Sequence, residues 1–212
     1  GLFAFGTQNI TVGTSFTRNG AGTYSGTGTF IYAGGAATFL HSSVAGAGVM
    51  TINNLQFNSA TVFQNNVGLV VVNTLTLNGV VLTNQQGGNS GSLLTVGDAT
   101  TVPTINVVGV GEVAANPLLF GNANADFNFT GATNPAALSV NVWPSAPSTV
   151  ARNVTLNRAA GIVLLGASRI ISNNLTLTAG TLTWDNPVDV SLPNAGQLIT
   201  RNFGGPLNND SS

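Results

Sequence analysis

Few residues in this chain can do acid–base chemistry. Of its 212 residues, five are Arg, six are Asp or Glu and one is a histidine, His41, while Lys and Cys are absent. A catalytic triad needs a carboxylate to orient its histidine, and no Asp or Glu lies near His41 in the sequence. Leu40 and Ser42 on either side are typical of a strand end and a turn. We expect His41 to be a polar surface residue.

The best carboxylate pair is Asp185 and Asp189, with Arg201 following. Parallel β-helix enzymes that cleave acidic polysaccharides generally use clustered Asp with Arg or Lys on one face. On an extended strand these two carboxylates would lie roughly 13 Å apart, whereas glycosidase pairs lie about 5–9.5 Å apart. A turn at Asn186-Pro187 could bring them closer, but turn formation itself explains these residues. We expect no enzyme and no catalytic residue, with a polysaccharide-active β-helix enzyme as the weakest alternative.

Motifs for cofactors and other ligands are also missing. The acidic residues are dispersed and form no calcium-binding loop, and glycine-rich stretches such as 108–111 lack the lysine of a phosphate loop. A net charge of −1 disfavours nucleic acid, which needs basic patches. The apolar runs, such as 68–72, are far shorter than a membrane span of about 20 residues. We expect no metal, no cofactor, no nucleic acid and no transmembrane segment.

The low charge itself points to assembly. Charged residues make up 5% of the chain, against about 25% in an ordinary globular protein. A net charge near zero removes the repulsion that keeps soluble proteins apart.

The elements that position all these residues follow from a repeat. Residues 172–184 (SNNLTLTAGTLTW) match residues 72–84 (VNTLTLNGVVLTN) at six aligned positions, and residues 52–64 (INNLQFNSATVFQ) form a looser copy twenty positions before the second. Each copy alternates apolar and polar residues over two short strands joined by a bend, and no window favours a helix. A period of about 20 residues predicts a right-handed parallel β-helix (β-solenoid), with five coils between the two best copies. The alternative is a β-sandwich or jelly roll of pilin-like or capsid-like type.

The domain organisation is simple. We expect residues 9–212 to form a single all-β domain, interrupted by a proline-containing loop near 143–148 (WPSAPS). Residues 1–8 (GLFAFGTQ) form an apolar N-terminal segment carrying Leu2, Phe3 and Phe5. This segment either folds as the first strand of its own domain or is donated as a strand to a neighbouring subunit.

The repeats are similar to those of a known class of proteins. Residues 173–184 (NNLTLTAGTLTW) and 73–84 (NTLTLNGVVLTN) resemble the "NLTLxxGTLT" repeats of large bacterial secreted and surface proteins, including autotransporter-like adhesins with β-helical stalks. The resemblance implies extracellular or cell-surface display and a role as a stalk, fibre or adhesin. A chain that starts at Gly1, without Met, is also what removal of a signal peptide on export would leave.

Together these features predict a structural subunit of an extracellular filament or surface fibre. It would form a homopolymer through β-strand or end-to-end contacts, with Leu2, Phe3 and Phe5 at the subunit contact. The alternative is a glycan-binding adhesin module that contacts sugars or another partner through Tyr24, Tyr32, Trp143 and Trp184. Flat Thr-rich faces also bind ice or crystalline sugars, and three pairs supply fragments of such a face: Thr74 with Thr76, Thr176 with Thr178, and Thr181 with Thr183.

Overall fold

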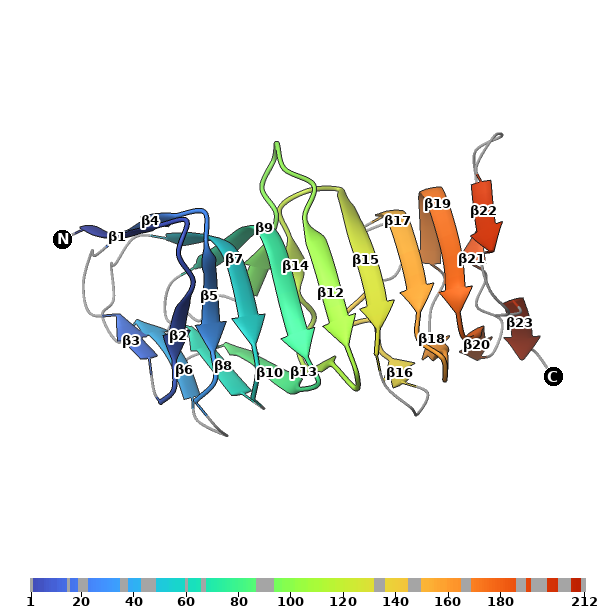
Figure 1. Cartoon of the computed structure of the whole chain (residues 1–212), viewed down its shortest axis with the longest axis horizontal. Coiled ribbons are helices and arrows are strands. Elements are labelled where there is room, and N and C mark those ends of the chain that lie inside the picture. Colours follow the sequence, from blue (N-terminus) through green and yellow to red (C-terminus); the bar gives the residue numbers. More distant parts are fainter. Residues whose placement is uncertain are drawn as a thin grey trace.

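The alternation of apolar and polar residues produces short strands that stack in parallel into a β-solenoid (Figure 1). The computed structural model describes residues 2–14, 16–18, 23–34, 38–42, 49–59, 61–65, 68–86, 94–131, 136–144, 150–164, 169–185, 190–191, 198–201 and 207–210. Within these ranges every strand is paired in parallel and no helix occurs. The β-solenoid prediction is therefore confirmed. The sandwich alternative is excluded, because sandwiches are built from antiparallel strands.

One long sheet forms the main face. Its strands lie in chain order along the solenoid, and several of them bend round a corner into the adjacent face. They are β2 (Ile10–Val12), β5 (Thr29–Tyr32), β7 (Met50–Phe57), β9 (Leu69–Asn78), β12 (Thr104–Val108), β15 (Asn124–Thr130), β17 (Val150–Asn157), β19 (Arg169–Ala179) and β22 (Leu198–Arg201), with the short β11 (Leu94–Val96), β14 (Leu119–Phe120) and β21 (Val190–Ser191) on the adjacent face.

Two shorter sheets follow one another along a second face. A pair of strands lies at the N-terminal end of the third face, which is the adjacent face named above. The second face contains β3 (Phe16–Arg18), β6 (Thr38–Ser42), β8 (Thr61–Asn65), β10 (Val81–Gln86) and β13 (Glu112–Ala115), then β16 (Ala136–Leu138), β18 (Ile162–Leu164), β20 (Leu182–Asp185) and β23 (Leu207–Asp210). The pair on the third face is β1 (Leu2–Gly6) with β4 (Thr23–Gly26).

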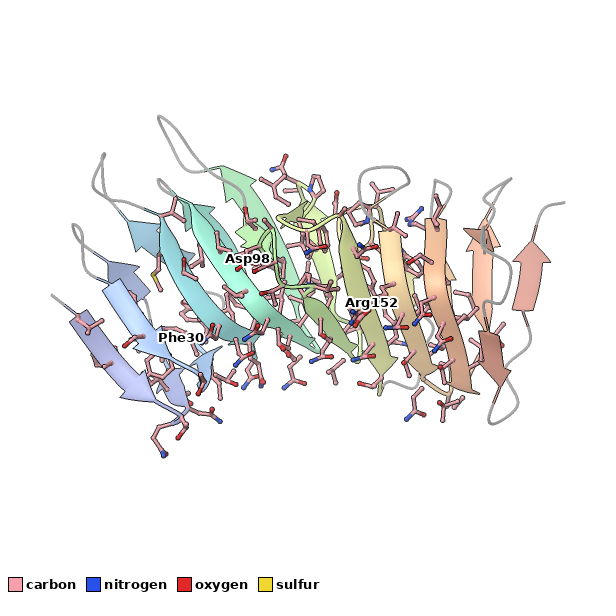
Figure 2. All side chains as sticks on the ribbon, turned by 90° about the horizontal axis from the view of Figure 1, so that it is seen from above. Phe30, Asp98 and Arg152 are labelled. Atoms are coloured by element: carbon pink, nitrogen blue, oxygen red, sulfur yellow. The ribbon has the colours of Figure 1, made fainter. Side chains whose placement is uncertain are left out.

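The apolar residues of the main sheet stack in columns inside the solenoid. One column pairs from strand to strand, and its members are 0–1% exposed: Phe30, Leu55, Leu75, Ile105, Phe127, Val154 and Leu175. A buried side chain of this size stabilises the fold by about 1.5–3 kcal/mol relative to an exposed one. The column therefore joins the coils into one continuous core (Figure 2 labels Phe30).

The coils are longer and less regular than the repeat predicts. Successive members of this column are 25, 20, 30, 22, 27 and 21 residues apart in the sequence. Leu55 lies one 20-residue coil before Leu75, as expected. Leu75 and Leu175, however, are separated by four coils averaging 25 residues (100/4), so the prediction of five coils is wrong.

Among the described residues, some of the additional length lies in corners between strands. In the 30-residue coil, the turn after β11 is held by Asp98, whose Oδ1 accepts hydrogen bonds from the backbone N–H groups of Thr100 (2.9 Å) and Thr101 (2.8 Å). These hydrogen bonds hold the pKa of Asp98 below its usual value. Such a corner can lengthen without moving the strands, because only strand residues take part in the stacked register.

The second face is interrupted between β13 and β16, which belong to different sheets. Side chains bridge this break instead of a strand ladder. The Glu112 carboxylate accepts hydrogen bonds from the backbone N–H groups of Val113 (2.7 Å) and Ser139 (3.2 Å), and Asn141 Nδ2 donates to the Val113 carbonyl (3.2 Å). Burial raises the pKa of Glu112 despite these bonds.

Glycine is required where one coil closes on the next. At Gly180 the backbone has φ +90°, and an added Cβ would meet the carbonyl oxygen of Arg158. Gly79 has a similar φ of +69°, but a Cβ there would meet nothing within 4 Å. The two positions share the left-handed backbone and differ in steric space.

The N-terminal segment and the proline loop are placed in part. Residues 2–6 form β1, which pairs in parallel with β4 of the same chain, so the segment folds onto its own solenoid. Trp143 and Pro144 are both buried at the start of the predicted loop, and residues 145–148 lie outside the described residues.

Candidate functional site

The N-terminal end of the solenoid exposes apolar side chains. Leu2 is 66% exposed and Phe3 is 52% exposed, whereas Phe5 is half-buried. Below them, a hollow of about 380 Å³ is lined by Phe3, Ile10, Val12, Tyr24 and Phe30. The Phe3 ring packs edge-on against Tyr24, with centroids 6.0 Å apart. Leu2, Phe3 and this lining set are hereafter called the N-terminal apolar surface.

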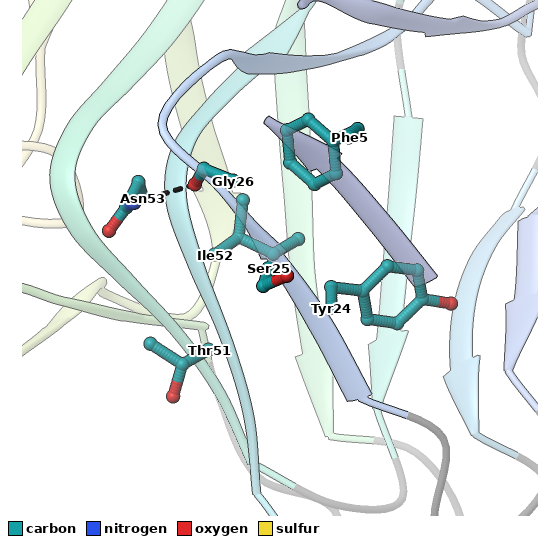
Figure 3. A pocket seen from close by; sticks show the side chains of 7 residues that line it. All are labelled: Phe5, Tyr24, Ser25, Gly26, Thr51, Ile52 and Asn53. Atoms are coloured by element: carbon teal, nitrogen blue, oxygen red, sulfur yellow. Dashed lines mark hydrogen bonds between the residues drawn. The ribbon is translucent and has the colours of Figure 1, made fainter. Parts of the chain in front are cut away.

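A second, smaller hollow lies between β4 and β7 (Figure 3). Its volume is about 200 Å³, and Phe5, Tyr24 and Ile52 form its apolar part. β4 and β7 do not pair through their backbones, but Asn53 Nδ2 donates a hydrogen bond of 2.6 Å to the Gly26 carbonyl across this seam. At this seam β4 and β7 are therefore joined through a side chain, whereas on the main face β5 and β7 are joined by a backbone ladder.

The aromatic residues expected to contact sugars have different environments. Tyr32 and Trp143 are 0% exposed, and the Trp143 ring stacks on Phe127 with centroids 5.2 Å apart. The prediction that Tyr32 and Trp143 contact a partner or glycan is therefore wrong, because both belong to the core. Tyr24 is half-buried at the N-terminal apolar surface. The side chain of Trp184 lies outside the described residues.

Trp143 is buried because the second face is interrupted at its coil. Residues 139–144 form a turn there, and this turn directs the indole against Phe127 and Phe129. Pro144 ends this turn, six residues after β16 has ended at Leu138, and its presence in the sequence does not show that the preceding aromatic turns inward.

The outward side of the main sheet is lined by polar residues. One column runs along it through Gln56, Thr76, Asn106, Asn128, Thr155 and Thr176. Asn128 Nδ2 donates to Asn106 Oδ1 (3.1 Å), and Asn106 Nδ2 donates to Thr76 Oγ1 (3.2 Å). Three members of the column are therefore joined by side-chain hydrogen bonds, as polar residues are in stacked strands.

A hollow interrupts this polar side. It has a volume of about 320 Å³ and lies over four neighbouring strands, β5, β7, β9 and β12. Its lining side chains are hydroxyls and primary amides: Thr29, Asn54, Gln56, Thr74, Thr76 and Asn106. The hollow and these six side chains are hereafter called the polar hollow. Thr74 with Thr76 is one of the fragments of such a face that the sequence predicts, and the 20-residue offset between residues 52–64 and 72–84 correctly aligns Asn54 and Gln56 with them. Thr29 and Asn106 come from coils whose register the repeat did not reveal.

The described carboxylates support the structure. Asp98 and Glu112 hold backbone groups, as described above. Asp126 forms an ion pair with Arg152 on the neighbouring strand, with Nε–Oδ1 and Nη2–Oδ2 distances of 3.0 and 2.5 Å (Figure 2 labels Arg152). This hydrogen-bonded contact raises the pKa of Arg152. Asp126 Oδ1 also accepts a hydrogen bond from the backbone N–H of Asn153 (3.0 Å).

The structure places the residues considered for catalysis only in part. His41 and Asp185 lie in β6 and β20, but their side chains and all of Asp189 are outside the described residues. Arg201 ends β22, where it pairs with Leu177. Within the described ranges, no group of three or more His, Cys, Asp or Glu side chains could hold a metal ion.

Two buried arginines were not predicted. Arg158 and Arg169 are both 0% exposed, and Arg158 Nη1 donates to the carbonyl of Gly109, two strands earlier in the main sheet. Burial lowers the pKa of Arg158. An isolated Arg next to a strand does not indicate from the sequence that its side chain is buried.

Comparisons with known proteins give no further guide to the site. No family model, curated protein or solved structure matches the chain. The described residues contain no helix that is long and apolar enough to span a bilayer.

Proposed function

We propose that this chain is a structural subunit of an extracellular, self-assembling filament or surface fibre, and that its copies join end to end. The N-terminal apolar surface carries the proposal. Its Leu2 and Phe3 are more than half exposed beside an apolar hollow of about 380 Å³. Large apolar groups concentrated in this way are typical of an interaction surface.

The backbone at this end supports contact with another solenoid. Among the described residues, each of β1, β2 and β3 is hydrogen-bonded to one strand only, so each leaves one edge open. Open edges recruit further strands unless charges, prolines or bulges block them. The side chains of the N-terminal apolar surface carry no charge, and the chain has no Lys at all. The pairings of β1 and β3 each contain one register shift and β3 contains Arg18, so β2 offers the most regular edge.

The parallel fold sets the direction of assembly. Within each sheet the described strands run in parallel, and the main sheet extends along the solenoid, so the two ends present opposite edges of that sheet. Only head-to-tail stacking of a second copy continues the main sheet in parallel, and a head-to-tail contact that does not close into a ring gives an open fibre. Because β1 already pairs with β4, end-to-end stacking fits this chain better than donation of residues 1–8.

The proposed location rests on the sequence. The similarity of residues 73–84 and 173–184 to repeats of bacterial surface and secreted proteins favours an extracellular or cell-surface fibre. The low charge supports close association of copies.

Introducing positive charge on the apolar surface tests this function. We expect the double variant Leu2→Lys, Phe3→Lys to shift the chain from polymers to monomers in sedimentation velocity, because Lys at an edge opposes strand pairing. The matched control is Val81→Lys, Val110→Lys, which adds the same charge at exposed apolar positions away from this end. Polymers that persist in the first variant, or a wild-type chain that stays monomeric at all concentrations, would refute the proposal.

A further inference from the structure

The amide groups that line the polar hollow are hydrogen-bonded within the chain. Asn54 Nδ2 donates to the Thr27 carbonyl (2.9 Å), and Gln56 Nε2 donates to Asn58 Oδ1 (2.6 Å). Asn106 Nδ2 donates to Thr76 Oγ1 (3.2 Å). Each amide group is therefore held in one orientation by a partner within the chain, which leaves oxygen acceptors on Asn54 and Gln56.

The threonines add hydroxyl groups to the hollow. The hydroxyls of Thr29, Thr74 and Thr76 line the same hollow, and a hydroxyl can both donate and accept. All six side chains are half-buried, so they are accessible to a ligand while their neighbours restrict their motion. The hollow thus offers neutral donors and acceptors in fixed positions and no charged group.

These groups lie on a regular grid. Neighbouring strands are spaced by about 4.8 Å, and alternate residues of a strand by about 6.7 Å. Thr74 and Thr76 occupy alternate positions of β9, and their partners Asn54 and Gln56 occupy the equivalent positions of β7. A ligand with hydroxyls along its length meets several partners at once on such a grid.

Other ligand classes fit this chemistry poorly. A phosphate, sulfate or carboxylate has only acceptor oxygens and finds no cation among the lining residues. Nucleic acid needs Lys or Arg for its phosphates. A protein partner needs an apolar and aromatic centre, and the lining side chains are polar except for the buried Leu55.

We propose that the polar hollow binds a neutral carbohydrate chain. Sugar hydroxyls are both donors and acceptors, so they pair with the Thr hydroxyls and with the oxygens of Asn54 and Gln56. The site does not depend on Tyr32 or Trp143, which are buried. It also lies on the side of the solenoid, so it is independent of end-to-end assembly.

Removing two hydroxyls without changing shape tests the site. The double variant Thr74→Val, Thr76→Val keeps the branched side chains that strands favour. The matched control, Thr155→Val, Thr176→Val, makes the same changes on the same sheet outside the hollow. Affinity for soluble dextran and mannan is measured by affinity electrophoresis with the whole chain, with dextran sulfate as the anionic comparison, and circular dichroism checks that each variant folds.

The expected result is binding of dextran or mannan that weakens about tenfold in Thr74→Val, Thr76→Val and is unchanged in the control, since each hydroxyl contributes one ordinary hydrogen bond. Failure of both neutral polysaccharides to bind overturns the proposal. So does equal or tighter binding of dextran sulfate, or equal weakening in both variants. Because the Leu2→Lys, Phe3→Lys variant leaves the hollow intact, its sugar binding is expected to equal that of the wild-type chain.

Discussion

Replacing Trp143 by Ala is expected to destabilise the solenoid strongly. The indole is 0% exposed and stacks on Phe127 and Phe129, with centroids 5.2 and 6.2 Å away. A buried Trp removes on the order of 200 Å² from water, which at about 25 cal/mol per Å² corresponds to about 5 kcal/mol. Trp→Ala changes in protein cores cost about 3–5 kcal/mol, because neighbours refill part of the cavity. We expect a loss of about 4 kcal/mol in the free energy of unfolding.

The assay is urea unfolding followed by far-ultraviolet circular dichroism, with Trp143→Phe as the control. Phe retains an aromatic ring against Phe127, so this variant is expected to lose about 1–2 kcal/mol. A loss below about 0.5 kcal/mol for Trp143→Ala is the size of an ordinary surface substitution. That result would refute the buried position and restore Trp143 as a candidate partner contact.

Two further predictions concern backbone space and burial. Gly180→Ala is expected to lower the free energy of unfolding by more than about 3 kcal/mol, because the added Cβ collides with the Arg158 carbonyl. Gly79→Ala is expected to lower it by about 1 kcal/mol, because only the left-handed backbone opposes the added Cβ there. Equal decreases in the thermal unfolding temperature of the two variants would contradict this. Burial raises the folded-state pKa of Glu112, so the stability linked to its protonation is present below its unfolded pKa and is lost as the pH rises through the folded value. Glu112→Gln, which lacks this titration, is expected to gain stability relative to the wild-type chain between pH 4 and pH 7 in urea unfolding, and a constant difference across that range would count against the assignment.

The sequence predicted the fold class because the interior column alternates strictly with outward polar residues. Leu55 and Leu75, and later Val154 and Leu175, carry the same triplet pattern in consecutive coils and do stack. The number of residues in each coil could not be predicted as well, because corners of different length separate the strands. The turn at Asp98 lies in the 30-residue coil, and this coil with the following coils of 22, 27 and 21 residues makes the 100-residue offset four coils rather than five.

The candidate sites were less predictable. Leu2 and Phe3 stood out because apolar residues are unusual near a chain end, and both are exposed. Their neighbours Ile10 and Phe30 join them only through stacking of the first coils, which no local pattern reveals. The polar hollow likewise requires knowing that Gln56, Thr76 and Asn106 lie side by side. Tyr32 and Trp143 were misplaced because their types suit both a core and a sugar contact.

The central claim is that whole solenoids stack end to end into a fibre. Electron micrographs of the purified chain, with the diffraction pattern of individual fibres, test it most directly. The proposal predicts unbranched fibres with a reflection near 4.8 Å along the fibre axis, since each coil advances by one strand spacing. Monodisperse particles, or fibres whose 4.8 Å reflection lies across the axis, would contradict it.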